Sequence, residues 1–191
     1  LRDVAEAVAI DPPVAARLVG IANLPLYGAP GDVDDIYLAT VLLGIDGICE
    51  IVMSFKIAGA VNESTDGTDQ NVFMANSVFR ASAARAIARL HNEELAPVAY
   101  TAGLLHDIGH VVLRECLDGE YPDFPPTLCG APLVDAERKA LGTSRIQAGR
   151  ALAEEWGLPA DLRDAIGVGY LDSAETRGDL AEIVALAALM G

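Results

Sequence analysis

Positive charge is scarce in this sequence: 13 Lys and Arg stand against 28 Asp and Glu, which gives a net charge of −15. Non-specific binding to nucleic acids depends on clustered Lys and Arg, and so does binding to anionic membrane surfaces. We therefore expect neither a nucleic acid nor a membrane as a partner. The one local exception is a run of basic residues: Arg138, Lys139, Arg145 and Arg150. Ordinary charge on a solvated helix surface explains this run better than a basic binding face does.

Cysteine is also rare, and the three cysteines are far apart in the chain: Cys49, Cys116 and Cys129. An odd, widely spaced set without a Cys-x-x-Cys pair argues against a disulfide framework and favours a reducing, cytoplasmic setting. No apolar run approaches the roughly 20 residues that a membrane-spanning helix needs, and the first residues do not resemble a signal peptide. Because the sequence starts without Met and stops within an apolar run, we expect a fragment of a longer chain.

Helix signals dominate what is present. Hydrophobic residues make up 52% of the chain, and the mean hydropathy is +0.32, which favours a well-filled core. Side chains that can cap helices precede apolar periodic segments at Asp11, at Asp34 or Asp35, and at Thr143 or Ser144, and glycines follow such segments at Gly44 and Gly142. With no convincing strand, these patterns predict an all-α fold of about eight to ten helices.

The stretch "YTAGLLHDIGHVVL" places His106 beside Asp107 inside a predicted helix over about 95–116. The pair could supply two metal ligands, or it could be a hydrogen-bonded pair in a helical core; the residues alone favour the core. His110, four residues after His106, would share its helix face, but the Glu that follows the first His in zinc proteases is absent. Glu137 is expected in the first turn of a helix over 133–142, where the helix dipole favours an acidic group.

Several segments, in order, resemble the HDOD domain, a bacterial signalling domain related to the HD phosphohydrolases. "IDPPVAARLVGIANLPLYG" and "IYLATVLLGIDGICEIVMSF" are similar to its first half, "AGLLHDIGHVVL" to the signature of its second half, and "ERKALGTSRIQAGRALAEEWGLPADLRDAIG" to the segment that follows. The resemblance implies one all-helical domain over residues 1–191. Its N-terminal helical part would cover about 1–60 and its HD-like part about 70–191.

The resemblance also implies where a metal site would lie. HD-type hydrolases, including those that cleave cyclic di-GMP, bind metals through His and Asp residues spread over several helices. The central pair of that pattern falls on His106 and Asp107. The other ligand positions fall on residues that are poor ligands or none: Asn76, Arg145, Gly169 and Tyr170, and Ala188. With three histidines in total, the chain cannot supply the missing set in any alignment.

We therefore interpret His106 and Asp107 as a vestigial metal pair and Arg145 as the charge partner of the former site. No cofactor and no catalytic residue is expected. The predicted function is a non-catalytic regulatory domain that acts through a protein partner, an adjacent signalling domain or ligand sensing. Two alternatives stay open: a metal-dependent phosphohydrolase acting on a nucleotide or cyclic dinucleotide, and a nucleotide bound without hydrolysis by the basic run 138–150.

Overall fold

The structure is a computed structural model. It describes residues 2–25, 33–59, 67–118, 120–125, 127–168 and 178–189. Over these residues the chain forms helices and no strand, so the all-α prediction is confirmed. The elements are α1 (Arg2–Val8), α2 (Pro12–Ala22), α3 (Ile36–Gly59), α4 (Gly67–His91), a short 3-10 turn (Glu93–Leu95), α5 (Ala96–Leu105), α6 (Ile108–Leu117), α7 (Gly130–Leu141), α8 (Arg145–Glu155), α9 (Ala160–Ala165) and α10 (Asp179–Ala188).

Local capping signals place most helix ends where the sequence predicts them. The Asp11 carboxylate accepts the Val14 N–H at 3.2 Å, and the Asp35 carboxylate accepts two N–H groups at the start of α3. Ser144 caps α8, and Gly142 ends α7 in the left-handed region with a φ of 73°. Gly44 is a kink inside α3, with a φ of 67°, and not the end of a separate helix.

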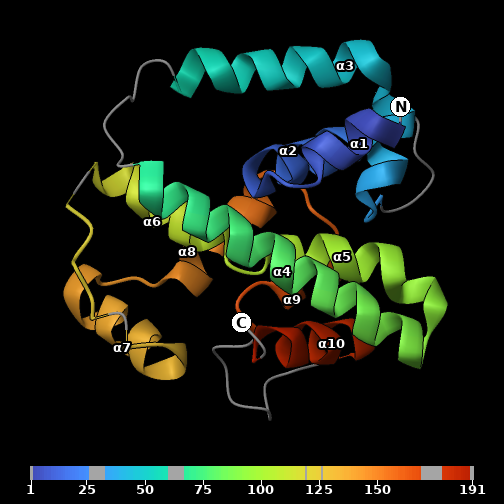
Figure 1. Cartoon of the computed structure of the whole chain (residues 1–191). Coiled ribbons are helices and arrows are strands. Elements are labelled where there is room, and N and C mark those ends of the chain that lie inside the picture. Colours follow the sequence, from blue (N-terminus) through green and yellow to red (C-terminus); the bar gives the residue numbers. More distant parts are fainter. Residues whose placement is uncertain are drawn as a thin grey trace.

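The helices enclose a continuous core of buried apolar side chains. Helices α4 and α5 lie side by side, and α10 crosses below them, while α6 lies beside α8 (Figure 1). Helices α1 to α3 cover the other side of α5. The core joins these elements and includes Leu18 of α2, Leu104 and Leu105 of α5 and Leu162 of α9. None of the described helices is long and apolar enough to cross a membrane.

The prediction of one helix over about 95–116 is wrong. Helix α5 ends at Leu105 and α6 begins at Ile108, because Asp107 adopts a φ of −113° and a ψ of 24°, outside the helical region. The Asp107 side chain makes no capping hydrogen bond to α6, so its carboxylate is available to other elements. The break therefore turns the chain and places Asp107 at the junction of two helices.

A glycine crossing sets the distance between α6 and α8. A Cβ atom on Gly109 would overlap the carbonyl oxygen of Arg145, and one on Gly149 would lie 2.9 Å from Cγ2 of Ile166 and 3.1 Å from the Gly109 nitrogen. The two backbones therefore approach more closely than any side chain would permit. This approach brings the first residue of α8, Arg145, to the helix junction that carries Asp107.

Substitution of Gly109 by Ala tests this crossing. We expect Gly109→Ala to lower the free energy of unfolding by about 3 kcal/mol, because the added methyl group forces α6 and α8 apart. In the control Gly47→Ala, the new Cβ meets only the Leu43 side chain at 3.4 Å, so stability should stay equal or rise slightly. Urea unfolding followed by circular dichroism measures both variants. Native stability in Gly109→Ala would show that the close approach is not required.

Candidate functional site

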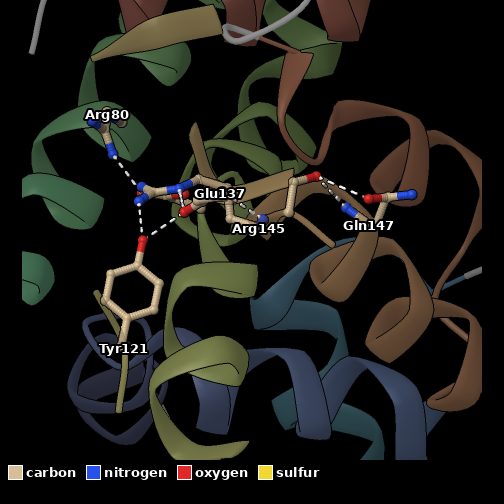
Figure 2. A network of polar contacts seen from close by, with 7 residues as sticks. Arg80, Tyr121, Glu137, Arg145 and Gln147 are labelled. Carbon is tan, nitrogen blue, oxygen red and sulfur yellow. Dashed lines mark hydrogen bonds and ion pairs between the residues drawn. The ribbon is translucent and has the colours of Figure 1, made fainter. Parts of the chain in front are cut away.

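A charged cluster is buried where the α5–α6 junction, α7 and α8 meet. Asp107 is 7% exposed, Arg145 8% and Glu137 fully buried. The Arg145 guanidinium lies between the two carboxylates: Nε donates to Oε1 of Glu137 at 2.8 Å, and Nη1 donates to Oδ2 of Asp107 at 3.1 Å. Figure 2 shows the neighbouring side chains converging on this guanidinium. The cluster is therefore an ion triad in which one cation joins two anions.

Glu137 is the most deeply buried member, and its expected position at a helix start is wrong. Helix α7 begins at Gly130, so Glu137 lies in the middle of the helix on the same face as Leu133 and Val134. Its Oε2 accepts the backbone N–H of Arg145 at 2.8 Å in addition to the side-chain contact at Oε1. Glu137 thus binds both the backbone and the side chain of Arg145. These contacts, and not the helix dipole, explain the position of Glu137.

Tyr121 connects the segment after α6 to the triad. Its hydroxyl donates to Oε1 of Glu137 at 2.6 Å and accepts from Nη2 of Arg145 at 3.1 Å (Figure 2). Burial, and next the hydrogen bond to Glu137, raise the pKa of Tyr121 to about 12. The phenol therefore stays protonated and remains a donor to the carboxylate over the physiological pH range.

Arg80 of α4 approaches the triad from another side. Its Nη1 lies 3.8 Å from Oδ2 of Asp107, an ion pair longer than a hydrogen bond. The Asp107 carboxylate therefore faces two guanidinium groups. The Nε–H group of Arg80 is buried and has no hydrogen-bond partner in the described part of the chain.

The two histidines of the HDIGH segment occupy different environments. His106 is 1% exposed, and burial lowers its pKa to about 4 despite the opposing effect of Asp107, so its imidazole is neutral near pH 7. His110 is half-buried, and its ring lies 5.8 Å from that of Phe73 and 5.5 Å from that of Tyr121, between centroids. Because the chain breaks between them, the two histidines do not share one helix face as the i, i+4 spacing predicts.

A cavity of about 860 Å³ opens beside the triad. His106, Asp107 and Arg145 line it together with Arg80, Arg114 and an aromatic group formed by Phe73, His110, Tyr121 and Phe124. The structure also brings Asn76 and Ala188 to this cavity, two further positions where the resemblance places metal ligands. Gly169 and Tyr170 lie outside the described residues.

The side chains around this cavity do not fit a divalent metal. Within the described ranges, no group of three or more His, Cys, Asp or Glu side chains could hold a metal ion. Asn76 offers a weak ligand and Ala188 none, and the guanidinium of Arg145 already occupies the Asp107 carboxylate. A fixed cation at 3.1 Å from the main anionic ligand opposes the approach of a second cation.

The basic run does not form one exposed surface. Arg145 is buried in the triad, whereas Arg138, Lys139 and Arg150 are exposed. Arg138 instead lies 3.5 Å from Asp135 on its own helix. The four residues therefore do not form a shared surface that could bind a nucleotide.

The sequence did not identify Arg80 and Tyr121 as members of the site, and it did not predict that Glu137 is buried there. A local signal existed for Glu137, because it follows Leu133 by one helical turn and so shares its apolar face. Arg80 neighbours Ser77, Ala81 and Ala84, which form the buried face of α4. Tyr121 follows a helix end in a proline-rich segment, and its local sequence indicates no buried partner.

Comparison with known proteins connects this site to a family. The model of the HDOD domain matches residues 1–170, in agreement with the resemblance of the sequence segments. A solved structure of the MmoQ response regulator from Methylococcus capsulatus str. Bath superposes with a TM-score of 0.78 at 25% identity, covering 99% of this chain and 76% of that one. A virulence factor from Campylobacter jejuni subsp. jejuni has the same fold, with a TM-score of 0.68, 21% identity and coverage of 97% and 67%. No curated protein sequence matches the chain.

Replacement of Arg145 tests the triad. We expect Arg145→Met to lower the free energy of unfolding by about 3–5 kcal/mol, because two buried carboxylates lose their shared cation. The matched control is Arg150→Met on the exposed side of the same helix, which should change stability by less than about 0.5 kcal/mol. Urea denaturation at pH 7 measures both variants, and equal stabilities would contradict the structural role of the triad.

Proposed function

Because this chain belongs to the HDOD domain family, we propose that it is a non-catalytic signalling and regulatory domain in which a guanidinium takes the place of a metal. The observation that carries the proposal is the contact between Arg145 and Asp107 at 3.1 Å. The likeness to a structure described as a response regulator supports a regulatory role. We further propose that residues 1–191 act as one HDOD-like domain of a longer signalling protein.

The chemistry of the triad supports a structural use of the HD pair. A catalytic metal activates a bound water by lowering its pKa and offers open coordination positions to a substrate. A guanidinium supplies one fixed positive charge but cannot coordinate water or generate hydroxide. Arg145 therefore provides a charge that holds the helices together without the hydrolytic chemistry. His106, neutral and almost fully buried, would then be a core residue.

An exposed apolar strip supports action through a protein surface. Five side chains on the first half of α3 are more than a third exposed: Tyr37, Leu38, Val41, Leu42 and Ile45. Such a strip is costly in water unless a partner covers it. We propose that a protein partner or an adjacent signalling domain contacts it. The free, exposed Cys116 and Cys129 favour a reducing compartment, consistent with a cytoplasmic location.

Metal content and turnover test the proposed function against a metal-dependent phosphohydrolase. The protein is incubated with Mn²⁺ or Zn²⁺, desalted and analysed for metal, and then assayed with bis(p-nitrophenyl) phosphate and a cyclic dinucleotide. We expect far less than one equivalent of metal and no hydrolysis above background, because Arg145 occupies Asp107.

The hydrolase would be supported by one equivalent of tightly bound metal together with turnover, both lost in Asp107→Asn. The control His91→Gln removes an exposed histidine at the end of α4, far along the helix from Arg80, and should leave both readings unchanged. Loss in Asp107→Asn with retention in His91→Gln would assign the metal to the HD pair and overturn the proposal.

A further inference from the structure

We propose that the cavity beside the triad binds a small organic anion that carries a planar ring, and that Arg80 receives the anionic group. This inference rests on the proposed function and specifies its ligand: the regulatory domain would sense a small molecule at the site where a hydrolase would bind substrate. The cavity volume of about 860 Å³ is within the range of small-molecule sites. Its wall contains both charged groups and aromatic rings.

Arg145 is not the group that would bind the anion. Each nitrogen of its guanidinium already has an acceptor in the protein: Nε contacts Glu137, Nη1 contacts Asp107 and Nη2 contacts the hydroxyl of Tyr121. A ligand could reach this guanidinium only by displacing a buried carboxylate, which is costly. The triad therefore forms a fixed wall of the cavity.

Arg80 is the cation with donors to spare. Its ion pair with Asp107 spans 3.8 Å, and its buried Nε–H has no hydrogen-bond partner among the residues that the structure describes. A buried donor without an acceptor is unfavourable, and a planar guanidinium suits a carboxylate or phosphate oxygen pair. Because Asp107 is shared with Arg145, it does not fully neutralise Arg80. An anion in the cavity would offset the positive charge that Asp107 leaves on Arg80, which lines the cavity.

The balance of charge around the cavity is positive. Among the described residues, the partly or fully buried cations that line the cavity are Arg80, Arg114 and Arg145. The buried anions are Asp107, which lines it, and Glu137, which pairs with Arg145, so three cations stand against two anions. Asp123, which also lines the cavity, is exposed, so water and salt screen its charge. Burial lowers the pKa of His110, which disfavours the positively charged form of its ring. In a chain of net charge −15, this local excess favours an anion.

The aromatic side of the cavity specifies the rest of the ligand. Phe73, His110, Tyr121 and Phe124 form a connected series, with centroids 5.8, 5.5 and 5.7 Å apart in that order. Leu128 and Leu133 add apolar surface. Rings of this kind pack against flat ring systems through offset or edge contacts. A planar ring with one carboxylate or phosphate substituent would therefore match both sides of the cavity.

Calorimetry with matched probes tests this site in buffer that contains EDTA. AMP and benzoate carry a ring and an anion, adenosine carries the ring alone, and inorganic phosphate carries the anion alone. We expect AMP or benzoate to bind at millimolar concentration or below. Adenosine, which has only the ring, and inorganic phosphate, which has only the anion, should bind at least tenfold more weakly than AMP. Whether AMP or benzoate binds more tightly distinguishes a phosphate from a carboxylate ligand.

Arg80→Gln should weaken binding of the anionic probe at least tenfold, whereas Arg89→Gln, an exposed arginine on the same helix, should not. Should Arg80→Gln fail to fold by circular dichroism, the Arg80 Nε–H resonance of the native protein gives the same information by NMR, and we expect it to shift saturably with the probe. Three results would overturn the inference: no binding of either ring-bearing anion, adenosine or phosphate binding equally well, or no effect at Arg80.

The EDTA condition separates this inference from the proposed function. Absence of binding without metal-dependent turnover contradicts the ligand inference and leaves the non-catalytic domain intact. Metal-dependent hydrolysis would contradict the proposed function, whatever binds in EDTA.

Discussion

The guanidinium of Arg145, buried between the carboxylates of Asp107 and Glu137, is the interaction on which the rest of the site depends. Buried charges are tolerated only when they are paired and hydrogen-bonded, so each member of this triad requires the other two. The triad joins the α5–α6 junction, α7 and α8, and Tyr121 adds the segment after α6. The glycine crossing of α6 and α8 brings the backbone of Arg145 close enough to form it.

The same interaction determines what the site can do. A fixed guanidinium pairs with the acidic residue of the HD pair, and its positive charge opposes the binding of a metal cation there, while a cavity lies beside the pair. Under the proposed function, the site keeps a substrate-sized cavity and replaces the metal of a hydrolase with a guanidinium. A domain with such a cavity but without hydrolytic chemistry suits regulation, in which binding changes a state and no substrate is consumed.

The features that the sequence predicts correctly are those whose deciding signal is local. The cap at Asp11, the glycine at 142 and the cap at Ser144 follow from short-range backbone chemistry, and the ordered family segments identified the fold. The break at Asp107 was missed because no proline stands near it and the apolar residues on either side fit a continuous helix. Glu137 was expected in the first turn of its helix, and its buried role was missed because that role depends on Arg145 and Tyr121, which other segments supply. Long-range charge pairing leaves little trace in periodicity.

The most direct test of the central claim is the coupling energy between Arg145 and Asp107, measured by a double-mutant cycle of unfolding free energies. The cycle compares Arg145→Met, Asp107→Asn and the double variant with the native protein in urea at pH 7. We expect a coupling of about 2 kcal/mol or more, because the second substitution removes a charge that the first left unpaired. Strictly additive effects, with a coupling near zero, would contradict it.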